Sequence, residues 1–297
     1  DEKKTEGVVV NSARIDARET DSAQVAWGET ADDITIINAP PGVTVTKSVT
    51  PGTPLHVPFP GTQPSSYPSA TYTLDAVNSS VSSASYVRVT DPPACTDAAQ
   101  MAACQSPGTA VGANADPFGD GIDWLSGAGQ GNPFDRFDLR RVTVSASIPG
   151  EVDLSASTVW LLRYADGDYT TERSTADVVN AAAPADLADV VGISVTFQGT
   201  DPAVSGGTIT SENRLRVVMD TQLRPTLRSS GKTQAVAANE RVGVANRVFA
   251  QSYDPILNDG VCTGDIDDVT VTLTGGDLNV APRKTISPNA LTEPTRN

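Results

Sequence analysis

Three polar residues, Lys47, Asp91 and Asn246, stand among apolar residues in segments whose pattern predicts β-strands. Alternate residues of a strand point to the same face. Lys47 therefore shares a face with three valines, Asp91 with Val87 and Val89, and Asn246 with four other small or branched apolar residues. Because lysine is almost never buried without a partner, its place on an inward face calls for a chemical explanation.

These three residue types can make a covalent bond. Burial drives a lysine toward its neutral, nucleophilic amine and keeps a neighbouring carboxyl protonated. The acid of Asp91 could then hydrogen-bond the carboxamide of Asn246 and make its carbon more electrophilic. Attack by the amine of Lys47 would expel ammonia and leave an amide between two strands. This interpretation makes Lys47 the nucleophile, Asn246 the acceptor and Asp91 the proton shuttle of a single-turnover cross-link.

Each residue also has an unreactive interpretation. Lys47 could extend its amine to solvent at the rim of a sandwich. Asp91 could cap the turn before Pro92 and Pro93, and a buried Asn246 could satisfy backbone groups. The alternation of a strand fixes the face of a side chain and leaves its depth open.

The elements that must position these residues are strands, because the apolar content is Val and Ala with abundant Thr. Period-two alternation, bounded by turn residues, predicts an all-β, Ig-like antiparallel sandwich. The predicted strands are 43–49, 71–78, 85–91, 141–147, 158–164, 192–198, 213–219, 241–250 and 268–274. Short helices are expected at 96–103 and 185–190, a long loop at 106–132, and an extended connection at 51–68.

The chain also contains an internal repeat. The segment KSVTP at 47–51 returns as KTISP at 284–288, an offset of 237 (284 minus 47). The segment around Asn11 resembles the one around Asn246, an offset of 235 (246 minus 11). We therefore expect residues 1–42 to be the C-terminal strands of a preceding repeat, 43–276 one full repeat, and 277–297 the first strand of the next. Residues 96–211 would be a large insertion or a second sandwich.

Four motifs in order, KSVTPG, YTLDAVNSS, VRVTDPP and VANRVFA, resemble the bacterial conserved-repeat Ig-like domain known as the domain of unknown function eleven. The resemblance covers the beginning and end of the repeat and implies a stalk or adhesin repeat on a bacterial surface. The chain is also similar to Gram-positive adhesins and pilins stapled by Lys–Asn isopeptide bonds. Carried onto this chain, that similarity points to Lys47, Asn246 and an acid such as Asp91. Asn78 is an alternative acceptor, and pairing across the repeat boundary could place Lys47 beside Asn11.

Other residues suggest supporting features. Cys95 and Cys104 flank a short segment and are expected to form a disulfide if the protein is extracellular, which leaves Cys262 over. Asp116, Asp120 and Asp123 lie in an oxygen-rich stretch that could hold calcium, although its spacing does not fit an EF-hand loop. Solvated acidic turns are the other interpretation.

Composition narrows the function classes. The chain of 297 residues has a net charge of -15, which disfavours nucleic-acid partners. Its single histidine is too few for a histidine-based metal site. It has no apolar run of the roughly 18 residues that a membrane span needs. We expect no enzyme and no required cofactor. The expected function is an extracellular structural repeat at a bacterial cell surface, with neighbouring repeats as partners. A ligand-binding adhesin head, contacting host or neighbouring cells, and a self-assembling S-layer or sheath subunit are the alternatives.

Overall fold

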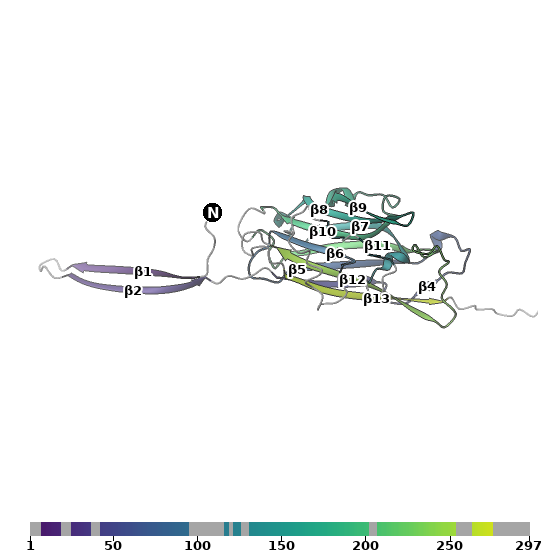
Figure 1. Cartoon of the computed structure of the whole chain (residues 1–297). Helices are drawn as coiled ribbons and strands as arrows, with labels where there is room; N and C mark the ends of the chain where they lie inside the picture. The colour runs from purple at the N-terminus through teal and green to yellow at the C-terminus, as the bar shows by residue number, and fades with distance from the viewer. Residues whose placement is uncertain are drawn as a thin grey trace, which may run out of the picture.

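The chain forms a β-sandwich preceded by a separate β-hairpin (Figure 1). The computed structural model describes residues 7–18, 25–36, 42–94, 116–118, 121–125, 131–201, 207–253 and 263–275. The hairpin pairs β1 (Gly7–Arg18) with β2 (Val25–Ile36) in a two-stranded sheet of its own. Figure 1 shows it extending away from the sandwich.

Two sheets make up the sandwich. The smaller has the order β3 (Val43–Thr50), β5 (Ser69–Asn78), β11 (Arg214–Leu223), β7 (Phe137–Ala146). The larger has the order β4 (Leu55–Val57), β13 (Thr263–Gly275), β12 (Arg241–Tyr253), β6 (Tyr86–Asp91), β10 (Val190–Gly199), β8 (Val152–Ala165), β9 (Asp168–Thr175). The described pairs are antiparallel except for β13 with β4. The all-β sandwich predicted from the sequence is therefore confirmed.

The core lies between the two sheets and follows from the alternation of each strand. In β5 each second residue is buried, from Ala70 to Asn78, while the residues between them are partly or fully exposed. The aromatic rings of Tyr72 and Phe137 meet edge to face across the smaller sheet, 6.5 Å apart. Inward-facing residues of both sheets thus form one continuous apolar core.

Side chains cap both edges of the smaller sheet. At the β3 edge, the backbone N–H groups of Val45 and Lys47 donate to carboxylates of Asp265 (2.9 Å) and Asp267 (2.7 Å) on β13. At the β7 edge, the side chain of Asn180 accepts from Val144 N and donates to Val144 O. Asn180 ends helix α2 (Ala176–Asn180), which starts at the N-cap Thr175. Capped edges cannot recruit another strand through these groups.

Short elements complete the fold. Single 3₁₀ turns occur at Pro64–Ser66, Pro133–Asp135 and Pro149–Glu151. The tight β8–β9 hairpin turns through Asp166 and Gly167, both with positive φ. That geometry is the two-residue turn that an Asp-Gly pair favours.

Each of the strands predicted within the sandwich is present, with boundaries shifted by a few residues. Segment 96–211 contributes β7, β8, β9 and β10 to the same two sheets, so its described part is not a second sandwich. The predicted helix at 185–190 is wrong: residues 185–189 form turns, and the helix lies earlier, at α2. Strands β4 and β9 were not predicted from the sequence. The predicted helix at 96–103 and the strand after 277 lie outside the described residues.

Candidate functional site

Lys47, Asp91 and Asn246 meet in the core between the two sheets. Lys47 projects from β3 of the smaller sheet, whereas Asp91 ends β6 and Asn246 lies on β12, neighbouring strands of the larger sheet. β6 ends here because Pro92, which follows Asp91, has no N–H for a ladder hydrogen bond. The side chains of Lys47 and Asp91 are 0% exposed, and Asn246 is 0% exposed as a residue.

The amine of Lys47 has two close partners. Nζ donates to Oδ2 of Asp91 at 2.5 Å and to the backbone oxygen of Arg247 at 3.0 Å. Arg247 follows Asn246 on β12, so the amine lies against the strand that carries the candidate acceptor. The ring of Tyr72 lies beside the amine, with its centroid 5.8 Å from Nζ. Lys47 thus bridges the two sheets.

Several buried polar atoms around the amine have no hydrogen-bond partner among the described residues. They are Oδ1 of Asp91, the hydroxyl of Tyr72, and both Oδ1 and Nδ2 of Asn246. An unsatisfied buried polar group costs about 1–3 kcal/mol. The carboxamide of Asn246 nevertheless lies near enough to Asp91 to lower the pKa of that carboxyl. The unlinked cluster therefore has a cost that a reaction between its members would relieve.

Burial controls the protonation of the cluster. It lowers the pKa of Lys47 to about 8, against the opposing effects of Asp91, Asp267 and Asp268. It raises the pKa of the Asp91 carboxyl, although Lys47 and Asn246 act in the other direction. Both shifts favour the neutral amine and the neutral acid, the forms that nucleophilic attack and proton donation require.

The unreactive interpretations do not fit this geometry. A side chain with no exposure does not reach solvent, so Lys47 is not a rim lysine. Oδ2 of Asp91 accepts from the lysine and not from the turn at Pro92 and Pro93. The carboxamide of Asn246 satisfies no described backbone group.

The alternative acceptors lie elsewhere. Asn78 sits at the far end of β5, paired with Val43, whereas Lys47 is paired with Leu74. Its Nδ2 donates to the backbone oxygens of Ser82 and Ile209, and its Oδ1 accepts from Ser80 N, so its carboxamide is fully engaged. Asn11 lies on β1, opposite Asp32 in the separate hairpin. Neither is placed beside Lys47.

Two residues of the site were not predicted from the sequence. Tyr72 is buried on the inward face of β5, and its contact with the amine depends on the packing of the sheets. Asp267, with Asp265 two residues earlier, fixes the backbone of β3 at Lys47 and Val45. The alternation of acids at 265 and 267 along β13 was a signal, but their partner strand is more than 200 residues away in the sequence.

The remaining predicted sites are described only in part. Cys95, Cys104, Cys262 and Asp120 lie outside the described residues. Asp116 accepts from Phe118 N and Thr171 Oγ1, and Asp123 accepts from Leu125 N and Tyr169 OH. No group of three or more acidic, histidine or cysteine residues suited to a metal occurs in the part of the chain that the structure describes. The calcium site stays a prediction.

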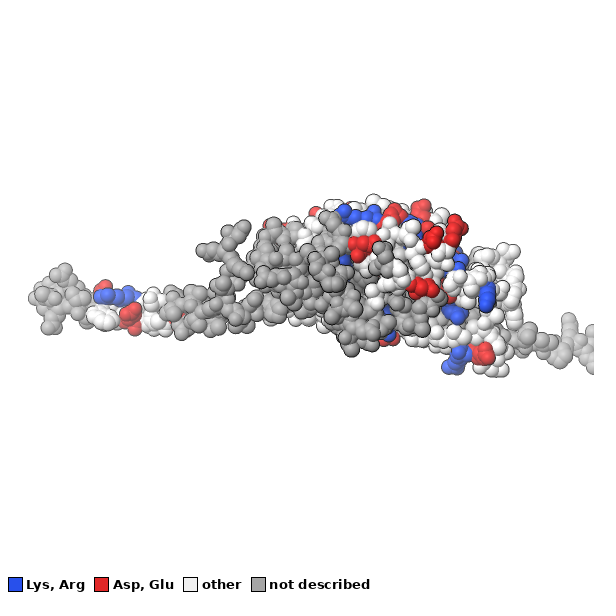
Figure 2. Space-filling model, viewed as in Figure 1, with Lys and Arg blue, Asp and Glu red and all other residues white. Residues whose placement is uncertain are grey.

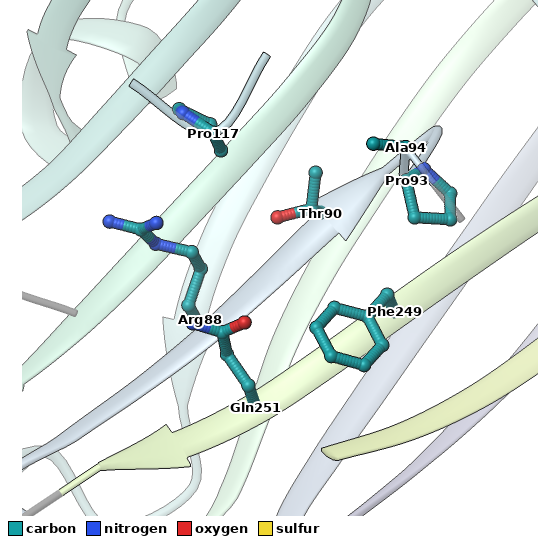
Figure 3. Close-up of a pocket in the computed structure, with 7 residues that line it drawn as sticks. All are labelled: Arg88, Thr90, Pro93, Ala94, Pro117, Phe249 and Gln251. Carbon is teal, nitrogen blue, oxygen red and sulfur yellow. The ribbon is translucent and has the colours of Figure 1, made fainter. Parts of the chain in front are cut away.

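Two small hollows are lined in part by residues of segment 96–211. The first, of about 10 Å³, lies beside β6 and β12 and is closed by the residues after β6 and by Pro117 (Figure 3). Its lining residues are Arg88, Thr90, Pro93, Ala94, Pro117, Phe249 and Gln251. It has room for about one water molecule. An open depression of about 200 Å³ borders Trp124, Asn132 and Arg136. Trp124 itself is 1% exposed and packs edge-on against Phe118, so this tryptophan belongs to the core.

Charges on the visible face of the sandwich are mixed in sign (Figure 2). Arg216 pairs with Asp75, Arg163 with Glu172, and Arg228 with Asp138. Among the described residues, no helix has the length and apolar character that crossing a membrane requires.

No protein-family model matches this sequence, and no curated protein matches it. A structure similar to part of this fold is the full-length major pilin SpaD from Corynebacterium diphtheriae, at 11% identity and a TM-score of 0.30. That match covers 89% of this chain and 59% of the pilin. AggA, the major subunit of aggregative adherence fimbriae type I from Escherichia coli, matches at 9% identity and a TM-score of 0.26, covering 79% of this chain and 95% of AggA. Similarities of this size assign no function.

Proposed function

We propose that this protein is a structural stalk or adhesin repeat of a bacterial cell-surface assembly, stapled by an autocatalytic amide between Lys47 and Asn246. The observation that carries the proposal is the convergence of a buried amine, a buried acid and an unpaired carboxamide between two sheets. The resemblance to the conserved-repeat Ig-like domain supports an extracellular location and neighbouring repeats as partners. The chemistry is self-directed and occurs once per chain.

We infer the following reaction between these groups. The neutral amine of Lys47 attacks Cγ of Asn246, while the protonated carboxyl of Asp91 donates to the carboxamide and polarises it. The tetrahedral intermediate expels the carboxamide nitrogen as ammonia, and Asp91 passes a proton from the attacking amine to the leaving group. One C–N bond forms and one C–N bond breaks, so the product is a neutral secondary amide. The buried charge of the lysine is then gone, which removes the desolvation cost of a buried ion pair.

Mass spectrometry of the intact, reduced chain tests the proposal. We expect a mass lower than that of the sequence by one ammonia, and a branched peptide joining Lys47 to Asn246 after digestion. Lys47→Met and Asn246→Ala should each restore the mass calculated from the sequence. Asn78→Ala, which removes a buried asparagine outside the cluster, should keep the deficit. A folded wild-type chain with the full mass would overturn the proposed bond.

A further inference from the structure

The N-terminal hairpin matches the β12–β13 hairpin of the sandwich at one constant spacing. Asn11 precedes Asn246 by 235 positions (246 minus 11). The pentapeptide DDITI at 32–36 precedes DDVTV at 267–271 by the same 235 (267 minus 32). The first match lies on the first strand of each hairpin and the second on the second strand. Both segments form antiparallel hairpins, so each sequence match lies on the corresponding strand of its hairpin.

The pairing registers of the two hairpins differ by a small, even step. Asn11 faces Asp32 in the first hairpin, whereas Asn246 faces Val269 in the second. Val269 corresponds to position 34 (269 minus 235), whereas Asn11 faces position 32, so the two registers differ by two residues. A shift of two leaves each residue on its own face of the sheet, whereas a shift of one would reverse every face.

The corresponding positions differ in their surroundings. Val248 and Ala250 of β12 are 0% exposed, because β12 lies between β6 and β13 with the core on one side. The equivalent residues of β1 are Ala13 and Ile15, and both are exposed, Ile15 at 75%. Among the described strands, β1 and β2 pair only with each other. An isolated two-stranded hairpin is at best marginally stable in water.

The hairpin also repeats the groups that contact β3. In the sandwich, Asp267 accepts from the backbone N–H of Lys47 at 2.7 Å, and the amine of the same lysine donates to the backbone oxygen of Arg247, the residue after Asn246, at 3.0 Å. The hairpin has Asp32 and Asn11 at these two places. It therefore carries both the acid that holds a lysine-bearing strand and the asparagine that would accept its amine.

We propose that β1–β2 is the closing hairpin of a second sandwich of this same type, and that Asn11 is the acceptor of a second lysine–asparagine bond. The occupant of its exposed face is the counterpart of β3 to β11, with a lysine in the place of Lys47 and an acid in the place of Asp91. The amine of that lysine would displace the carboxamide nitrogen of Asn11 as ammonia. The bond rests on the proposed function, whereas the structural equivalence of the two hairpins does not.

A block exchange in the full chain tests this equivalence. Residues 242–271 are replaced by a second copy of residues 7–36, which has the same length of 30 residues (36 minus 7 plus 1). We expect the exchanged chain to fold, with the transplanted amides exchanging hydrogen at least about a hundredfold more slowly than the same amides in the N-terminal hairpin. We also expect Lys47 to be linked to the transplanted copy of Asn11, with loss of one ammonia.

Two further variants make each outcome decisive. The same exchange with Asn11→Ala in the transplanted copy should fold without the bond. A smaller exchange replaces residues 242–253 by a copy of residues 7–18 and keeps β13. It provides the same measurement of amide protection if the larger exchange does not fold. Transplanted amides that stay unprotected in both exchanges would overturn the equivalence. If the parent chain forms its bond and a folded exchange does not, Asn11 is no acceptor. If the parent forms no bond, the proposed function fails, and amide protection alone still decides the equivalence.

Discussion

Asp91 is the residue on which the proposed cross-linking chemistry depends. Its carboxyl contacts the amine of Lys47 and lies beside the carboxamide of Asn246, and burial raises its pKa. An amide at this position has nearly the same shape but does not exchange protons with an amine at neutral pH.

Asp91→Asn should therefore abolish the bond while leaving the sandwich folded. Intact mass should rise to the full value calculated from the sequence, and circular dichroism should keep the spectrum of a β-protein. Asp116→Asn, which changes an acid outside the cluster, is the matched control and should keep the mass deficit. Bond formation at the wild-type level in Asp91→Asn would show that the acid is not the proton shuttle.

Bond formation should also depend on pH. Since burial lowers the pKa of Lys47 to about 8, the neutral amine increases about tenfold per pH unit below that value and levels off above it. Chain recovered unfolded in denaturant and diluted into buffers from pH 6 to 9 should lose ammonia at a rate that rises toward pH 8. A rate that is independent of pH across this range would contradict the role of Lys47 as a neutral nucleophile.

At the scale of elements, β3 is held by two different means. One edge of β3 pairs with β5 along its whole length, and its other edge is bound by the carboxylates of Asp265 and Asp267 from the opposite sheet. This latch sets the position of β3 against β13 and thereby the position of Lys47 against β12.

Removing the Asp267 contact with β3 should destabilise the sandwich of a chain that has no bond between Lys47 and Asn246. In an Asn246→Ala background, Asp267→Ala leaves the N–H of Lys47 without its acceptor and should lower the free energy of unfolding by about 1–3 kcal/mol. Asp267→Asn, which keeps an acceptor oxygen, should lower the free energy of unfolding by less. Asp268→Ala removes an exposed neighbour and is the control. Equal urea midpoints for the Asp267 and Asp268 variants would show that the latch contributes nothing.

At the scale of the whole molecule, the bond would close a loop of 199 residues (246 minus 47) between the two sheets. By the chain-entropy argument used for disulfides, a cross-link of this span stabilises a fold by about 5 kcal/mol. Wild type should therefore unfold at a clearly higher denaturant concentration than Lys47→Met, which keeps the apolar stem and removes the amine. Coinciding unfolding curves for a linked wild type and Lys47→Met would contradict this estimate.

The same loop should not extend under force. A pull on residues outside the loop passes from β3 to β12 through the bond, so the 198 residues between Lys47 and Asn246 (246 minus 47 minus 1) stay out of the extended chain. Single-molecule stretching of wild type should lack about 650–700 Å of contour length that Lys47→Met releases. Full release by a chain shown to be linked would mean that the bond joins other residues.

Local sequence patterns were enough to predict most strands of the sandwich, the faces of their residues and the candidate chemistry. Alternation along 43–49, 85–91 and 241–250 placed Lys47, Asp91 and Asn246 on inward faces, because side-chain direction in a strand is a local property with a period of two. Local turn signals likewise predicted the strands of an all-β sandwich. Local patterns did not locate β9, whose exposed residues carry no apolar alternation.

Which of these residues meet depends on how the two sheets pack. Asn78 and Asn246 are both buried, but the stacking of the sheets brings the amine of Lys47 onto β12 at Arg247, next to Asn246, and engages Asn78 at the far end of β5. The depth of Lys47, the ring of Tyr72 beside it and the latch of Asp267 all depend on contacts between strands distant in the sequence. A local pattern fixes the face of a residue, whereas its neighbours and its desolvation arise when two sheets pack.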